Sequence, residues 1–300
     1  MNHKPKVSDY DHSDYSRFWT ENQRQYDDRI ERKVVSELLP AEGDWFADFG
    51  CAHGRLADIY MERFRHCVFV DYSTRHLNLA KQLYGNNEKA IFVAADIYRL
   101  PFRPKSFNAA MMVRVLHHLE EPSLALREVA AAIMPSGRFL MNYRNRRDLR
   151  NMLRALVGLK NVRPFRIAHD NLPGCDGLQA FTHPKIARQL MEMAGFRIMR
   201  TRGTSFFGGK LLRIINNPVP LEAPLSPLLG ALKLSPLIFI DAKLEGTPDN
   251  SRQPPSSVKE LLACPDCKID LEWSANEYRC RSCNTVFKEI DGIFDFRKNC

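Results

Sequence analysis

The chain has 300 residues, of which 44% are hydrophobic and 26% are charged. This composition is ordinary for globular proteins, the length suggests about two domains, and wholesale disorder and fibrous classes are excluded. The longest apolar stretch, Leu225–Ile240, contains Lys233 and two prolines, so we expect no transmembrane helix. Residues 1–19 are polar and predict no secretory signal peptide. We therefore expect a cytoplasmic protein.

Strands and helices are expected to alternate after an N-terminal arm and a helix that ends near Pro40. The predicted strands are 45–49, 67–70, 90–94, 107–113 and 138–143, and the predicted helices are 55–64, 73–84 and 121–134. Ser73 has the character of an N-cap, and the strand at 107–113 is apolar enough to be buried on both faces. This alternation predicts an α/β fold with a doubly wound, Rossmann-like, mostly parallel sheet.

The rest of the chain is expected to add a helix at 184–194, a strand at 196–201 and a hairpin partner near 206–215. We therefore divide the chain into an N-terminal arm and helix, an α/β domain with a basic insertion, a proline-rich bridge and a C-terminal module. Their predicted ranges are 1–40, 41–215 with the insertion at 144–180, 216–257 and 258–300.

A glycine loop joins the first predicted strand to the next helix. Gly50 and Gly54 lie where the strand turns, so that a ligand can approach the backbone and the N–H groups of the helix start. The loop matches neither the dinucleotide fingerprint G-x-G-x-x-G nor Walker A. NAD and FAD are therefore disfavoured.

Aspartates follow three successive predicted strands. Asp71 could accept the hydroxyls of a ribose, Asp96 could accept a hydrogen bond from an adenine amine, and Asp48 could hold an ammonium group. Each of them alone is more simply interpreted as an ordinary loop residue. Their common placement at the carboxyl ends of parallel strands favours a nucleoside site.

These motifs resemble the class I S-adenosylmethionine-dependent methyltransferases over roughly residues 22–203. The resemblance is carried by Asp48–Gly54, Val70–Ser73, Ala95-Asp96, Leu100–Phe102, Ser106–Asn108 and Val115–Leu119, the last of which is most similar to the ubiquinone/menaquinone-biosynthesis type. It implies that S-adenosylmethionine is the methyl donor. No Asn-Pro-Pro-aromatic tetrapeptide follows the fourth strand, so methylation of adenine amines and glutamine amides is disfavoured.

The resemblance also implies roles for individual residues. The methionine portion of the donor would lie against Gly50, Cys51 and Gly54, its ribose against Asp71, and its adenine against Tyr72, Asp96 and Ile97. Arg114 would face the sulfonium side, where relatives usually have a small or neutral residue. A general base is needed only if the acceptor must lose a proton, and we assign none. The candidates are His117, His118, His169 and Tyr143, and packing is the simpler interpretation of the first two.

A basic segment follows the fifth strand. Residues 144–170 contain eight arginines and lysines against two aspartates, and Leu149, Met152, Leu153 and Leu156 share one face of a predicted helix. Its arginines, expected to cap the acceptor side of the pocket, could contact RNA, an anionic membrane surface or an acidic substrate, or form a solvated face. They are Arg146, Arg147, Arg150 and Arg154. Leu225–Ile240 is expected to pack on the domain, with shallow insertion into lipid as the alternative.

Two C-x-x-C pairs, Cys264/Cys267 and Cys280/Cys283, predict a tetrahedral four-thiolate site that is structural. Zinc is favoured, and iron as in rubredoxin is the alternative. The surrounding residues resemble the zinc-ribbon activator subunit of several transfer-RNA, ribosomal-RNA and release-factor methyltransferases, here fused to an enzyme. Cys67, Cys175 and Cys300 are interpreted as core or surface thiols.

The sequence thus predicts an S-adenosylmethionine-dependent methyltransferase that acts on a small or lipid-like acceptor. RNA is the alternative acceptor, supported by the basic helix and the ribbon. A third hypothesis is a donor-binding scaffold in which Arg114 has ended catalysis.

Overall fold

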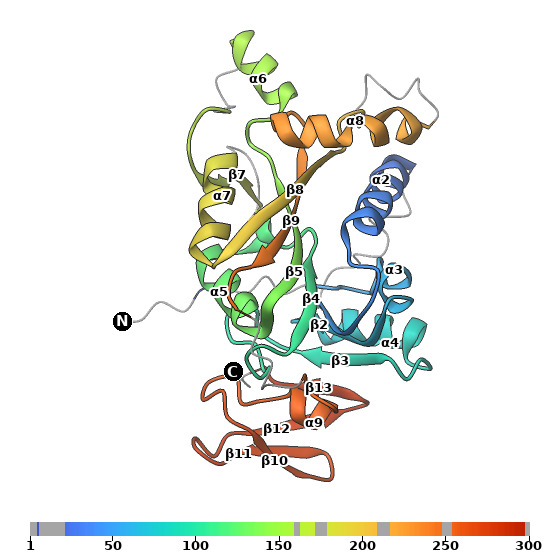
Figure 1. The fold of residues 1–300 in the computed structure, drawn as a ribbon, viewed down its shortest axis with the longest axis vertical. Coiled ribbons are helices and arrows are strands. Elements are labelled where there is room, and N and C mark those ends of the chain that lie inside the picture. Colours follow the sequence, from blue (N-terminus) through green and yellow to red (C-terminus); the bar gives the residue numbers. More distant parts are fainter. Residues whose placement is uncertain are drawn as a thin grey trace.

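The computed structural model describes residues 5, 22–158, 163–171, 179–208, 217–247 and 254–297. Parallel strands form the centre of the sheet, in the spatial order β3-β2-β1-β4-β5 (Figure 1). Their bounds are β1 Gly43–Phe49, β2 Phe64–Asp71, β3 Ala90–Ala94, β4 Phe107–Met112 and β5 Ile133–Arg144. The sequence prediction of a Rossmann-like, mostly parallel sheet is confirmed.

Helices cover both faces of this sheet because its strands bury side chains on both sides. In β1, Trp45 and Phe49 pack into the core on one face and Phe46 into the core on the other. The Phe46 face is covered by α2 (Asn22–Leu38), α3 (Ala57–Met61) and α4 (Thr74–Tyr84), and the Trp45 face by α5 (Pro122–Ala132) and α7 (Pro184–Met193). The Ser73 hydroxyl caps α4 by accepting a hydrogen bond from the His76 N–H.

Two expected boundaries differ in the structure. The helix predicted at 55–64 is shortened to α3, because the turn after the glycine loop extends to Leu56. The fifth strand begins at Ile133, so Pro135-Ser136-Gly137 lies inside β5 and does not separate a helix from a strand. The pairing of β4 with β5 shifts register there, and Ser136 adopts a positive φ of 67°. An irregularity within the strand therefore accommodates the proline and glycine.

The expected proline-rich bridge supplies a helix and a strand. Residues 216–257 contain α8 (Val219–Leu232) and β9 (Leu237–Leu244). β9 lies between β5 and β8 (Phe196–Thr204) and is antiparallel to both. Its apolar residues are buried, as expected for a strand inside the sheet. It replaces the hairpin partner expected at 206–215, of which 209–215 lie outside the described residues. We propose that the α/β domain extends to Leu244.

The C-terminal module continues the same sheet. It consists of α9 (Val258–Leu261), β10 (Leu271–Ser274), β11 (Glu277–Cys280), β12 (Val286–Ile290) and β13 (Ile293–Asp295). β13 pairs in parallel with β3 through Ile293 opposite Phe92. Further backbone hydrogen bonds join the module to the α/β domain, from Arg103 N to Leu261 O, from Ala263 N to Pro101 O and from Phe296 N to Ala94 O. The Leu100–Phe102 motif therefore holds the module in place.

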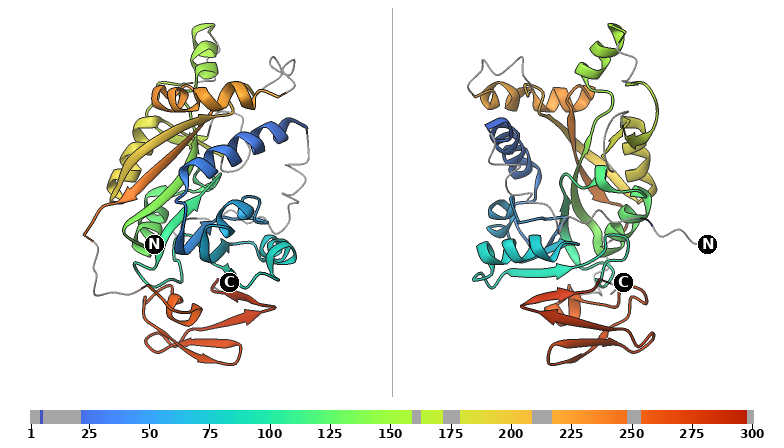
Figure 2. Two further views of the ribbon diagram at one scale, coloured as in Figure 1. Left: turned by 45° about the vertical axis from the view of Figure 1, so that its right-hand side comes forward. Right: turned by 180° about the vertical axis from the view of Figure 1, so that it is seen from behind.

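The remaining elements lie at the opposite end of the molecule from this module (Figure 2). They are α6 (Leu149–Leu156) and α8, with a small hairpin of β6 (His169–Asn171) and β7 (Ala180–Thr182) nearby. No helix among the described residues is long and apolar enough to span a membrane. The arm residues before Asn22, together with Cys175 and Cys300, lie outside the described residues, Pro5 excepted.

Candidate functional site

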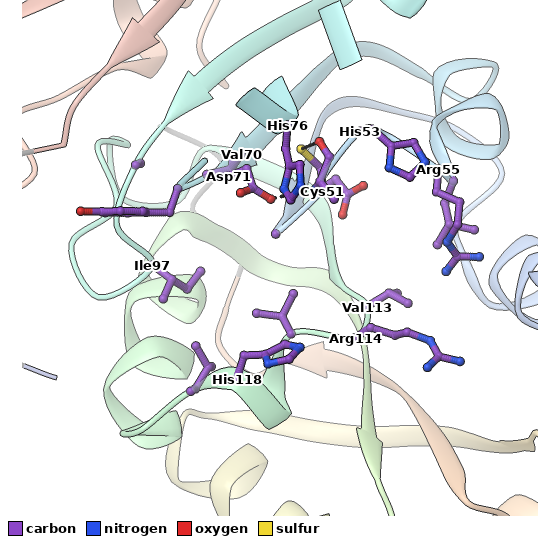
Figure 3. Close-up of a pocket in the computed structure, with 18 residues that line it drawn as sticks. Cys51, His53, Arg55, Val70, Asp71, His76, Ile97, Val113, Arg114 and His118 are labelled. Atoms are coloured by element: carbon purple, nitrogen blue, oxygen red, sulfur yellow. Dashed lines mark hydrogen bonds between the residues drawn. The ribbon is translucent and has the colours of Figure 1, made fainter. Parts of the chain in front are cut away.

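A cavity opens at the carboxyl ends of β1 and β4, where the order of the parallel strands reverses. Ligands bind at this place in open α/β sheets. The cavity has a volume of about 1030 Å³ including its open mouth. Of the residues predicted to bind the donor, its wall contains Asp48, Gly50, Cys51, Asp71, Tyr72, Ile97 and Arg114 (Figure 3).

The Asp71 carboxylate is held in place before any ligand binds. Its Oδ2 accepts a hydrogen bond of 2.8 Å from the Ala52 N–H in the glycine loop, and its Oδ1 accepts one of 2.9 Å from the Ser73 N–H. Burial raises the pKa of Asp71, while these two N–H groups favour the ionised form and act against that shift. The residue at the end of β2 therefore offers fixed acceptors at the cavity wall.

The two glycines of the loop have different tasks. Gly50 has a φ of +74°, and a Cβ there would lie 2.3 Å from Val115 Cγ2, so only glycine fits where the loop passes the end of β4. Gly54 has the same φ, but its neighbours are rings of the core, with Phe69 Cε1 at 2.8 Å from an added Cβ. Gly54 is not part of the cavity wall, so its glycine serves packing.

Asp48 and Cys51 form the deep side of the cavity. Burial raises the pKa of Asp48 to about 8, and the nearby Asp71 charge adds to the shift. Burial also raises the pKa of the Cys51 thiol well above its ordinary value. Near neutral pH this side of the cavity therefore offers a protonated carboxyl group and a protonated thiol. A cation bound beside Asp48 would lower the pKa of its carboxyl group and favour the ionised form.

The turn after β3 contributes the two neighbours of Asp96 to the cavity wall. Ala95 and Ile97 line the cavity, and Asp96 does not. The Asp96 carboxylate accepts a 2.9 Å hydrogen bond from the Tyr98 N–H and so fixes the turn after β3. The structure therefore brings together most of the predicted donor-binding residues, with Asp96 and Gly54 beside the cavity.

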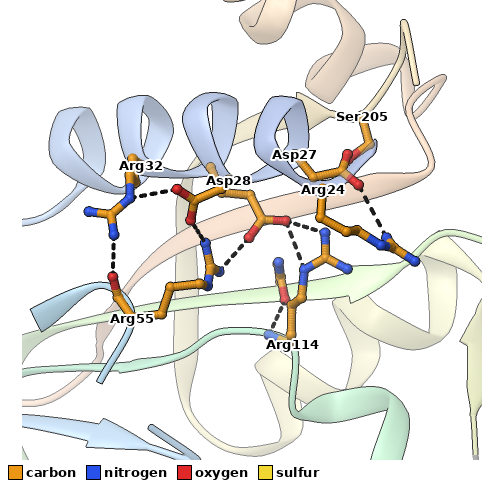
Figure 4. A network of polar contacts seen from close by, with 9 residues as sticks. Arg24, Asp27, Asp28, Arg32, Arg55, Arg114 and Ser205 are labelled. Carbon is orange, nitrogen blue, oxygen red and sulfur yellow. Dashed lines mark hydrogen bonds and ion pairs between the residues drawn. The ribbon is translucent and has the colours of Figure 1, made fainter. Parts of the chain in front are cut away.

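Arg114 reaches from the cavity wall to α2. Its Nε donates to Glu31 Oε1 at 2.8 Å, and Arg55 Nη2 donates to Glu31 Oε2 at 2.7 Å (Figure 4). Glu31 is completely buried between these two arginines, which both line the cavity. Arg55 also pairs with Asp28, one turn earlier on α2. The N-terminal helix is thus tied directly to the cavity, a connection that sequence reasoning missed.

The structure separates the four candidate bases. His118 lines the cavity, on the side opposite Asp71 and His76 (Figure 3). His117 is buried beside it, and burial lowers its pKa well below the ordinary value. Both ring nitrogens of His169 are engaged, by Thr182 Oγ1 at 2.8 Å and Leu119 O at 3.2 Å. Tyr143 is buried in the core, and burial raises its pKa. Only His118 of the four is placed to meet a ligand.

The basic helix does not cap the cavity, contrary to the prediction. No residue of α6 belongs to the cavity wall, and its apolar face is not turned to the core, since Leu153 is 53% and Leu156 is 80% exposed. Arg146 is buried, pairs with Asp170 and donates to its carbonyl at 3.0 Å. Arg150 donates to the carbonyls of Ser205 and Phe206. These two arginines hold loops together, Arg147 is partly buried, and Arg154 is exposed.

The four cysteines of the C-terminal module converge as predicted. All four Sγ atoms lie within 4.8 Å of one another, and Cys264 Sγ lies 3.7 Å from Cys283 Sγ. A tetrahedral metal with bonds of about 2.3 Å to sulfur separates its ligands by roughly 3.8 Å, so the cluster fits such an ion. Cys67, in contrast, is buried in the core of the α/β domain.

Comparison with known proteins finds methyltransferases. Residues 47–141 match the model of a family described as a methyltransferase domain. The chain is 31% identical over 121 residues to O-methyltransferase cnsE of Penicillium expansum, a match that covers 38% of this chain and 43% of that protein. It is 24% identical over 179 residues to ubiquinone biosynthesis O-methyltransferase of Coxiella burnetii, covering 59% and 74%. The chain spans about half or less of the length of the first curated relatives that it matches.

Solved structures share the fold. A methyltransferase of Thermotoga maritima, described as a possible histamine N-methyltransferase, superposes with a TM-score of 0.53 at 17% identity, covering 78% of this chain and 97% of that chain. A chain from the complex of the Haloferax volcanii Trm112 methyltransferase activator with a methyltransferase superposes with a TM-score of 0.52 at 13% identity and the same coverage. The protein therefore has the fold of the class I S-adenosylmethionine-dependent methyltransferases, and residues 47–141 of this fold match the methyltransferase-domain family.

Proposed function

We propose that the protein transfers a methyl group from S-adenosylmethionine to a hydroxyl oxygen of a small or lipid-like acceptor. The observation that carries this proposal is the Asp71 carboxylate, fixed by two backbone N–H groups in the wall of a cavity at the strand reversal. The matched O-methyltransferases support oxygen as the accepting atom. The sulfonium of the donor supplies an activated methyl group, so in-line positioning provides most of the rate.

The cavity residues divide the donor among them. Asp71 would accept hydrogen bonds from the ribose hydroxyls, and Tyr72 and Ile97 would enclose the adenine. Gly50 and Cys51 would lie against the methionine portion. Asp48 would hold the ammonium group, which would lower the raised pKa of its carboxyl group by opposite charge. Arg114, already paired with Glu31, would close the acceptor side together with α2.

His118 is the residue proposed to take the acceptor's proton. A hydroxyl must lose its proton as the new carbon–oxygen bond forms and the carbon–sulfur bond breaks, leaving S-adenosylhomocysteine. The His118 ring lies in the cavity wall on the side facing Asp71 and His76, where a methyl acceptor could approach (Figure 3). His117, adjacent in sequence, is buried and provides a matched comparison.

We further propose that Cys264, Cys267, Cys280 and Cys283 bind a structural zinc ion. Four thiolates leave no open position for catalysis, and such sites are stable in a reducing compartment such as the cytoplasm. The module contributes to the core beneath β3, so its folding would support the donor-binding half of the sheet.

A labelling experiment tests the proposed function. Purified protein is incubated with methyl-labelled S-adenosylmethionine and a lysate of its own source, and the product is separated into RNA, protein and organic-soluble fractions. Label in the organic fraction, lost in His118→Ala and kept in His117→Ala, is the expected result. Label in RNA would overturn the small-molecule acceptor and favour RNA methylation. Donor binding without any labelled product would favour the non-catalytic scaffold.

A further inference from the structure

A row of leucines on α8 faces away from the core. Leu221, Leu225, Leu228 and Leu232 follow each other at spacings of four, three and four residues, which places them on one stripe of the helix. Their exposed fractions lie between 41% and 56%. An apolar row of this length on a protein surface usually marks an interaction site.

The helix cannot turn this row inward. Its buried side is fixed on β8, where a Cβ at Gly230 would lie 2.7 Å from the backbone of Arg202 and the Ser226 hydroxyl donates to Gly203 O at 2.8 Å. Glu222 on the same side accepts hydrogen bonds from the Phe206 and Phe207 N–H groups. Since Glu222, Ser226 and Gly230 are directed to the protein together with the buried Leu229, the four leucines of the row are directed away from it.

The outward side of α8 carries no charge, unlike the outer side of an ordinary surface helix. The one charged residue within Val219–Leu232 is Glu222, which is completely buried. The prolines Pro220, Pro224 and Pro227 are exposed and add further apolar surface. Water is therefore a poor partner for this side of the helix.

The neighbouring segments also expose apolar residues. α6 begins beside the end of α8, where the Leu149 N–H donates to Leu234 O at 3.0 Å. Both helices lie at the end of the molecule opposite the cysteine module (Figures 1 and 2). The large exposed apolar residues of α6 and of the segment after it are Leu153, Leu156, Val157, Phe165 and Ile167.

The segments that carry this surface have a net positive charge, and Glu37 of α2, which lies beside Val219 and Pro220, is paired with Arg202. The described parts of 144–171 and 217–234 contain three acidic residues, Asp148, Asp170 and Glu222. Asp148 and Glu222 are buried, and Asp170 pairs with arginines. Arg154 and Arg163 in the same segments are exposed. Leucines beside cationic side chains, with no exposed unpaired carboxylate in these described segments, complement a lipid surface that carries negative headgroups.

We propose that α8 and α6 dock on an anionic phospholipid bilayer. The leucines enter the boundary between headgroups and acyl chains, and the arginines contact the headgroups. RNA would use the arginines alone and leave the leucine row in water, so lipid accounts for both features. The docking brings the protein to the surface in which a lipid-like acceptor resides, but it does not depend on the proposed reaction.

Vesicle sedimentation with the whole chain tests the proposal without any activity assay. Wild type is expected to bind vesicles of phosphatidylcholine with phosphatidylglycerol and to bind pure phosphatidylcholine more weakly. The double variant Leu225→Gln/Leu228→Gln is expected to lose at least about tenfold in affinity, and Arg154→Gln about fivefold. The matched control is Leu83→Gln on α4, which removes a leucine that is 64% exposed on another part of the molecule. It is expected to bind as wild type does.

Other outcomes would overturn the proposal. Wild type that fails to sediment with either vesicle would do so, as would equal losses for Leu83→Gln and the α8 variant. Binding to an RNA oligonucleotide that weakens with Arg154→Gln and not with the α8 variant, in the absence of vesicle binding, would assign the arginines to RNA. Circular dichroism of each variant separates loss of docking from loss of folding.

Discussion

The two flanks of the sheet differ in how they are completed. On one flank, β2 and β3 continue into β13 of the cysteine module, and the turns after these strands form the donor side of the cavity. On the other flank, β5 is followed by β9 and β8, and α8, whose outer leucines remain exposed, packs on β8. The first flank is completed within the chain by a module that the proposed metal would hold together. The second presents an apolar surface that suits an external partner.

Removal of the metal is expected to have the largest effect and to act on one flank alone. Structural zinc contributes on the order of 10 kcal/mol to the folding of small modules, so a chelator should unfold the described module residues 254–297. β3 would then lose its hydrogen-bonded neighbour. Hydrogen exchange should show lost protection in the module and reduced protection at Ala90–Ala94. β9 should keep its protection, and zinc should restore the original pattern. Equal loss on both flanks would contradict this separation.

Breaking the Glu31 contact is expected to loosen the helix that bridges the cavity. Glu31→Gln removes a completely buried charge from between Arg55 and Arg114, so that both arginines lose the Glu31 carboxylate while Arg55 keeps its pair with Asp28. The free energy of unfolding should fall by about 3–5 kcal/mol, as measured by urea denaturation. Asp28→Asn, in the same network but partly exposed, should cost only about 1 kcal/mol. A smaller effect for Glu31→Gln than for Asp28→Asn would contradict the role of burial.

A smaller, pH-dependent effect is expected on the α8 flank. Burial raises the pKa of Glu222 to about 7, against an unfolded value of about 4.3. The folded state binds the Glu222 proton more tightly than the unfolded state does. Protonation of Glu222 therefore stabilises the fold fully below about pH 4, and this stabilisation is lost as the pH rises to about 7. Glu222→Gln should therefore gain about 1–3 kcal/mol near pH 8 and nothing near pH 4, by thermal denaturation. Glu192→Gln, in an exposed pair with Arg188, should change little at either pH. A gain of equal size at both pH values would exclude the titration of Glu222 as the cause.

The donor flank could be predicted from sequence because its signals are local. A strand end, a glycine with positive φ and an N-capping serine each act within a few residues, and Gly50, Asp71 and Ser73 lie as expected. The cysteine pairs carry the same kind of local information, since each pair occupies one tight turn. The two pairs are expected to converge in space because one tetrahedral metal ion takes four thiolate ligands.

The other flank could not be predicted because long-range pairing decides it. The prolines before Leu237 indicate a linker, but β9 gains its place from two antiparallel neighbours distant in sequence. The leucine period in α6 predicts an apolar face, although a period cannot say whether core or partner covers it. Glu31 carries no sequence signal, because its two arginine partners come from separate loops.

Titration calorimetry with S-adenosylmethionine tests the central claim, that the cavity is a donor site organised by Asp71. Wild type should bind the donor, and Asp71→Ala should bind it about 100-fold or more weakly, since charged hydrogen bonds to the ribose are lost. Asp71→Asn keeps one acceptor oxygen and controls for collapse of the loop that Ala52 and Ser73 form with Asp71. Asp96→Ala, outside the cavity wall, should lose less than about tenfold. Wild-type affinity in Asp71→Ala, or no heat with wild type, would contradict the account.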